Sequence, residues 1–84
     1  MVKVRDIAQT NIRKIEGAAK TFVTEKKSMK WALSQITDVP IRGRELQEII
    51  ERIVNNVAEI VKDEPIRERG NDLLKKLEDE RLLA

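Results

Sequence analysis

Apolar residues recur at helical spacing most densely between Glu45 and Asp63. When each residue is turned by about 100° from the one before it, they cover close to half of a helical cylinder. These residues are Leu46, Ile49, Ile50, Ile53, Val54, Val57, Ala58, Ile60 and Val61. A surface helix commonly carries a stripe only about 100° wide. The wider stripe predicts a helix that packs against neighbours on both flanks, as the central helix of a bundle does.

The first apolar stripe predicts a helix over residues 4–23. Its members are Val4, Ile7, Ala8, Ile12, Ile15, Ala18, Ala19, Phe22 and Val23, and Asn11 is the polar residue among them. Gly17 falls on the opposite side of this helix, where we expect solvent. The alternative explanation for that glycine is the close approach of a partner backbone.

The first stripe fails at Glu25 and Lys26, which would both be buried if the helix continued. In one interpretation the helix ends near Thr24, and Ser28 caps a second helix over residues 28–37. In the other, a single helix reaches Thr37, since apolar residues resume on the same face further along. That helix would be about 50 Å long, more than its neighbours can cover, so we favour two helices and leave the single helix open.

Two prolines mark the remaining boundaries. Asp38-Val39-Pro40 ends the second helix, because the residue before a proline avoids helical geometry, and Asp38 is a candidate cap for the helix that follows. The central helix is predicted over about 44–63, and a start as early as Val39 stays open. Asp63-Glu64-Pro65 repeats the signal, with Asp63 as the candidate cap.

A last helix is predicted over 65–81. Its narrower stripe consists of Ile66, Gly70, Leu73, Leu74 and Leu77. The run Gly70-Asn71-Asp72 could interrupt it. The tail, residues 82–84, falls outside the stripe, so it either frays or forms the end of an interface.

These elements predict an all-α fold, a small bundle of three to four helices around a central helix at about 45–63, in one domain spanning 1–84. The chain has 84 residues, enough for one modest core. Phe22 and Trp31 are its only aromatic residues, and Ile, Leu, Val, Ala, Lys, Glu and Arg dominate the rest, as in helical bundles. The charged fraction of 38% and the lack of cysteine would also suit a thermophile.

The composition excludes several kinds of site. Without histidine, cysteine or tyrosine, the chain lacks the usual bases, thiolate nucleophiles and soft metal ligands, so we expect no enzyme and no catalytic, cofactor-binding or metal-binding residue. Glu45, Glu48 and Glu59 share the polar face of the central helix, where carboxylates could hold Mg²⁺. A solvated face with weak ion pairs is the favoured interpretation.

No apolar run is long enough to span a bilayer. Residues 1–9 lack the apolar core of a signal peptide. We therefore expect a cytoplasmic protein without a membrane partner.

Charge is distributed unevenly along the chain. Residues 1–37 hold eight basic side chains against three acidic ones, a net charge of +5, whereas residues 38–64 hold four against seven, a net charge of −3. Such asymmetry suggests an anionic partner for the first half. The alternative is that the basic first helices lie against the acidic central helix.

Lys26, Lys27, Lys30 and Trp31 form the most suggestive local cluster. A tryptophan among lysines can stack on a nucleic-acid base while the ammonium groups hold phosphates. It can equally anchor a protein partner. In a purely structural interpretation another helix covers Trp31, and the lysine stems lie over the ring.

Arg42 and Arg44 flank a glycine in a predicted turn, where they could grip phosphates. The favoured alternative is that they cap or pair with the acidic helix beginning at Glu45. Because that helix carries several carboxylates on its outer face, it would be repelled from a DNA major groove, which argues against a helix-turn-helix reader.

Two functional hypotheses follow. The first is a small non-catalytic helical interaction module, an accessory or assembly subunit that binds a protein partner or a second copy of itself. It rests on the wide apolar stripe of the central helix, because we expect a chain of 84 residues to leave part of that stripe exposed. The alternative is a nucleic-acid-binding protein, or an accessory subunit of a replication or transcription complex, that uses the basic N-terminal half.

Overall fold

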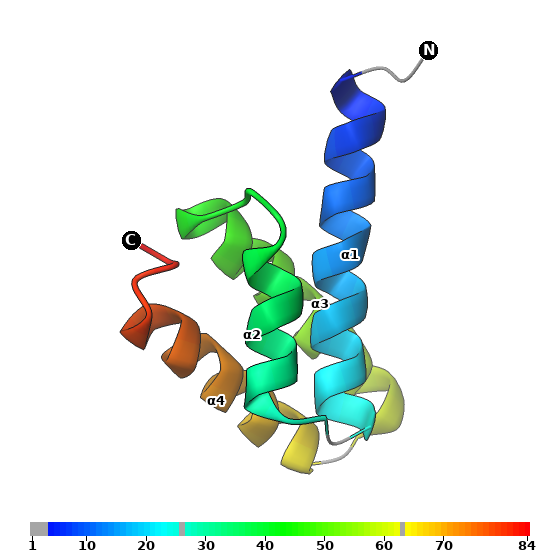
Figure 1. Ribbon diagram of the computed structural model, residues 1–84. Coiled ribbons are helices and arrows are strands. Elements are labelled where there is room, and N and C mark those ends of the chain that lie inside the picture. Colours follow the sequence, from blue (N-terminus) through cyan, green and yellow to red (C-terminus); the bar gives the residue numbers. More distant parts are fainter. Residues whose placement is uncertain (1–3, 26, 63) are drawn as a thin grey trace.

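The computed structural model describes residues 4–25, 27–62 and 64–84, apart from the side chains of 4–8 and 64. The described residues form four helices: α1 (Val4–Glu25), α2 (Met29–Thr37), α3 (Gly43–Val61) and α4 (Glu64–Asp79). They contain no β-strand, and the helices pack into one small bundle (Figure 1). The predicted all-α fold class is therefore confirmed.

Helix α3 lies between α1 and α4 and packs against both, while α1 also contacts α2 and α4. The largest fully buried side chains come from every helix and from the α2–α3 connection: Ile15, Ile36, Val39, Leu46, Ile50, Leu73 and Leu77. Burying an aliphatic side chain of this size stabilises the fold by about 1.5–3 kcal/mol. The two flanks of α3 predicted from its stripe are thus α1 and α4. The N-terminal turns of α1 project beyond the other helices (Figure 1).

The chain breaks between α1 and α2, as the favoured interpretation predicted. Helix α1 continues to Glu25, and Ser28 caps α2, because its hydroxyl oxygen accepts a hydrogen bond of 3.1 Å from the backbone N–H of Trp31. Arg69 of α4 holds the break in place. Its guanidinium donates to the carbonyl oxygens of Phe22 (2.8 and 3.1 Å) and Lys27 (3.0 Å), and it lies 4.4 Å from the centroid of the Phe22 ring.

The connection between α2 and α3 differs from the predicted one. Asp38 ends α2 as its C-cap, and its N–H donates to the carbonyl of Ser34 at 3.3 Å. It does not cap the following helix, which begins only at Gly43 and has Arg42 at its N-cap position without a capping side-chain bond. Val39 and Ile41 are buried, so the two apolar side chains of this connection anchor it to the core. The other predicted cap, Asp63, lies outside the described residues.

The C-terminal tail returns to the start of α3. The N–H of Gly43 donates to the carbonyl oxygen of Leu82 at 2.7 Å, and Leu82 and Leu83 are half-buried against the core. Gly43 has a φ of +69°, a conformation that favours glycine. Figure 1 shows the C-terminus beside this end of α3. The tail therefore belongs to the bundle, although its sequence lies outside the α4 stripe.

Helices α3 and α4 cross closely at Gly70. A Cβ atom on Gly70 would lie 2.5 Å from Cγ1 and 3.0 Å from Cγ2 of Val54, so the crossing depends on the missing side chain. Gly70 does not interrupt α4, which is continuous from Glu64 to Asp79. Gly17, for which a close approach was the alternative, is exposed, and a Cβ there would meet no atom within 4 Å.

We expect Gly70→Ala to lower the free energy of unfolding by about 1–3 kcal/mol, because the new methyl group overpacks the α3–α4 crossing. Gly17→Ala is the matched control, since it adds the same methyl group at an open helical position and should raise the free energy of unfolding by about 0.5–1 kcal/mol. Urea unfolding followed by circular dichroism measures both. A Gly70→Ala protein as stable as the parent would contradict the close crossing.

Candidate functional site

The tryptophan cluster predicted from sequence is partly assembled. Trp31 lies in the first turn of α2 and is half-buried against the core, and the Lys27 ammonium nitrogen lies 5.7 Å from the centroid of its ring. Lys30 is exposed beside it. Lys26 lies outside the described residues. A lysine above a half-buried ring is the arrangement of a side chain that covers apolar surface while its charge stays in water.

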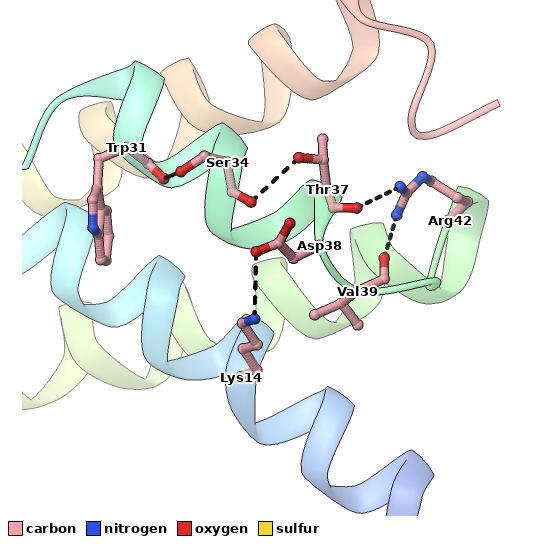
Figure 2. A network of polar contacts seen from close by, with 7 residues as sticks. All are labelled: Lys14, Trp31, Ser34, Thr37, Asp38, Val39 and Arg42. Atoms are coloured by element: carbon pink, nitrogen blue, oxygen red, sulfur yellow. Dashed lines mark hydrogen bonds and ion pairs between the residues drawn. The ribbon is translucent and has the colours of Figure 1, made fainter.

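Arg42 serves the fold. Its guanidinium donates to the carbonyl oxygens of Thr37 (3.2 Å), Ile41 (2.8 Å) and Val39, and so ties the end of α2 to the connection before α3. Figure 2 shows the bonds to Thr37 and Val39. Contrary to the favoured interpretation, Arg42 neither caps nor pairs with the helix that begins near Glu45, because its guanidinium is bonded to the end of α2 and the connection instead.

Arg44 forms an ion pair with Glu48 one turn along α3, at 3.3 Å. Both side chains are exposed, so the pair stabilises the helix little. Figure 2 also shows that Trp31 and Arg42 lie at opposite ends of α2. The two groups of candidate residues, the tryptophan cluster and the arginine pair, therefore do not form one site.

The uneven charges are only partly neutralised within the bundle. Lys14 of α1 pairs with Asp38 at 3.7 Å (Figure 2). The ion pair that joins α1 to α3 has the opposite polarity to the one expected, since Arg52 of α3 meets Glu16 of α1 at 3.9 Å. Among the residues described, no lysine of α1 pairs with a carboxylate of α3. The basic surface of α1 and the acidic surface of α3 both face outward.

The apolar stripe of α3 is not fully covered, and sequence reasoning missed where the cover ends. Leu46 and Ile50 are completely buried, whereas Ile60 is 83% exposed and Val61 is 51% exposed. These two are the exposed large hydrophobic residues of the described chain. Figure 1 shows the last turns of α3 passing behind the lower end of α1 and appearing on its other side. We call Ile60 and Val61 the α3 ridge.

The α3 ridge borders a groove between α1 and α3. The groove has a volume of about 210 Å³ and is lined by Lys20, Thr24, Ile53, Asn56, Val57, Ile60 and Val61. Its α3 wall is mainly aliphatic, and its α1 wall supplies Lys20 and Thr24. Apolar lining with few polar groups is typical of surfaces that bind other molecules.

The backbone explains why the ridge is left uncovered. Lys62 ends α3 in a left-handed conformation (φ 53°), with its N–H bonded to the carbonyl of Ala58 at 2.7 Å. The chain therefore turns away directly after Val61. The sequence indicated that part of the α3 stripe would stay uncovered, because the stripe is wider than two flanking helices cover. Which residues stay uncovered depends on the paths of α1 and α4, which the sequence does not give.

A second hollow lies between α3, α4 and the tail. Its volume is about 580 Å³, and its lining is Gln47, Asn71, Leu74, Lys75, Glu78, Arg81, Leu83 and Ala84.

In the described part of the chain, no buried side-chain nitrogen or oxygen lacks a hydrogen-bond partner. Among the described residues of the chain, no three carboxylates lie close enough together to hold a metal ion. None of the helices described is both long and apolar enough to cross a bilayer.

Comparison with protein families, curated proteins and solved structures returned no match. The chain's own geometry therefore carries the functional interpretation.

We expect Arg42→Met to lower the free energy of unfolding by about 1–3 kcal/mol, because it leaves carbonyl groups of the α2–α3 connection without their donor. Arg44→Met, two residues away, removes an exposed pair and should change it by no more than about 0.5 kcal/mol. Thermal and urea unfolding compare the two. Equal stability of both variants would contradict the structural role of Arg42.

Proposed function

We propose that the protein is a small non-catalytic helical interaction module, an accessory or assembly subunit that binds another protein surface through the α3 ridge. The 83% exposure of Ile60 beside an aliphatic groove is the observation that carries the proposal. Apolar side chains gathered beside a groove on an otherwise charged surface mark interaction sites. A fifth helix laid against α1 and α3 would complete the cover of the α3 stripe.

The energetics favour a contact centred on Ile60. Transfer of an exposed aliphatic side chain into an apolar environment stabilises a complex by about 1.5–3 kcal/mol. The groove beside the ridge is already formed in the free chain, because α1 and α3 are joined by buried contacts and by the Arg52–Glu16 pair. A partner therefore meets a prepared surface, and little binding free energy is lost in ordering it.

Trp31 is a secondary contact candidate. It lies on α2 and is not among the groove-lining residues. Because Trp31 is partly buried against the core and Lys27 lies over its ring, its side chain is less exposed than that of Ile60. The α3 ridge is accordingly the primary surface of the proposal.

The proposed surface is tested by capturing partners from an extract of the source cells. Ile60→Asp places a carboxylate on the ridge, and Asn55→Asp places the same group on another face of α3 as the matched control. We expect the parent chain and Asn55→Asp to retain a specific protein, and Ile60→Asp to retain at least about tenfold less of it, since tenfold corresponds to about 1.4 kcal/mol. Equal retention by Ile60→Asp would overturn the proposal.

The nucleic-acid hypothesis rests on the basic surface of α1 and α2. Lys20, Lys27 and Lys30 are exposed, and no ion pair in the described part of the chain includes them. Arg42 and Arg44, however, are engaged in bonds within the chain. The lysines alone support a weaker, non-specific contact.

A salt titration separates this alternative from the protein-binding module. Phosphate contacts release counterions, so binding to single- or double-stranded DNA or RNA would strengthen steeply as salt is lowered. We expect binding weaker than micromolar even at low salt, measured by fluorescence anisotropy with labelled oligonucleotides. Micromolar or tighter binding that weakens when Lys27 and Lys30 are both changed to Gln would favour the nucleic-acid hypothesis instead.

A further inference from the structure

We propose that the surface which covers the α3 ridge is the same ridge of a second copy of this chain. In this two-fold symmetric dimer, Ile60 of each copy enters the α1–α3 groove of the other, and Lys20 of each copy faces Glu59 of the other. The inference rests on the proposed function, because both use the α3 ridge as a contact surface, and it names the occupant.

The ridge and the groove are complementary to each other. Ile60 projects from α3, and the hollow beside it is lined by Ile53 and Val57 on the same helix. Two-fold symmetry places the same patch of both copies face to face. The projecting side chain of each copy can then enter the aliphatic hollow of the other. One axis near Ile60 therefore buries both ridges at once.

The charges around the groove match this arrangement. Lys20 is the charged residue among those that line the groove, and it stands on the α1 wall. Glu59 precedes Ile60 on α3 and is exposed. None of the ion pairs formed by the described residues includes either side chain. When Ile60 of a second copy enters the groove, its neighbour Glu59 comes to the wall that carries Lys20.

The wider charge distribution favours the same occupant. Residues 1–37 carry a net charge of +5, from eight basic and three acidic side chains, and residues 38–64 carry −3, from four and seven. Within one copy the α1–α3 pair, Arg52–Glu16, leaves this imbalance in place. Docking across the groove brings α3 of each copy beside α1 of the other, so opposite surfaces meet.

Other occupants fit these observations less well. A nucleic acid in the groove would bring phosphates close to Glu59, which repels them. A small apolar ligand would leave Lys20 and Glu59 without partners. A different protein with an apolar anchor next to a carboxylate matches the same chemistry, and the experiment separates it from a second copy.

The purified full chain is tested first by sedimentation equilibrium from about 1 μM to about 1 mM, which spans weak to moderate association. We expect a reversible monomer–dimer equilibrium. Ile60→Asp should weaken dimerisation at least about tenfold, and Asn55→Asp, with the same added charge on another face of α3, should leave it unchanged. Circular dichroism verifies that each variant remains helical.

A charge exchange then tests the predicted contact. Lys20→Glu and Glu59→Lys should each weaken the dimer, because each places like charges together twice across the axis. The double variant should regain dimerisation. An equimolar mixture of the two single variants should form a heterodimer, since its two contacts are again Lys against Glu.

Each result has a defined meaning. A parent chain that stays monomeric over the whole range, or a dimer that Ile60→Asp leaves intact, overturns the second-copy proposal. Failure of the double variant to regain dimerisation overturns the Lys20–Glu59 contact. A monomeric chain that still captures a different protein through Ile60 overturns this inference and leaves the proposed function standing, whereas loss of both results overturns both.

Discussion

The burial of the α3 stripe between α1 and α4 is the constraint on which the rest of the fold depends. Nearly half of the α3 cylinder is apolar, so two flanking helices must lie close to it. Gly70 allows α4 to approach Val54 closely enough, and the break after α1 leaves room for α2 to pack against α1. The stripe is least covered at Ile60 and Val61, the last two residues of α3.

Much of this architecture is readable from the sequence, because helical period and proline position are local signals. A bundle of three to four helices and the central place of α3 follow from them, whereas the break before Ser28 is favoured and the single helix stays open. The contacts that join distant segments do not follow. Arg69 caps the end of α1 from α4, and Leu82 bonds Gly43. The sequence around Arg69 or Leu82 does not indicate which distant residue each one contacts, so only the packed structure reveals these contacts.

The candidate site shows the same division. Sequence reasoning expected that the α3 stripe would exceed its cover, and it named the apolar remainder of that stripe and Trp31 as the protein contact, with nearby lysines and arginines as further candidates. The structure engages Arg42 in three carbonyl bonds and leaves the aliphatic end of α3 exposed. Arginine and tryptophan are common at interfaces, but an arginine can also satisfy orphan carbonyls within its own chain. Residue type alone does not separate these roles.

The hydrogen bond from Gly43 to Leu82 joins the start of α3 to the tail that follows α4. The first N–H of a helix has no acceptor within that helix. Arg42 provides no side-chain cap for α3, and the carbonyl of Leu82, near the far end of the chain, accepts the hydrogen bond from Gly43. Loss of the tail contact would leave the first N–H of α3 without this acceptor. We therefore expect the tail and the first turn of α3 to stabilise one another.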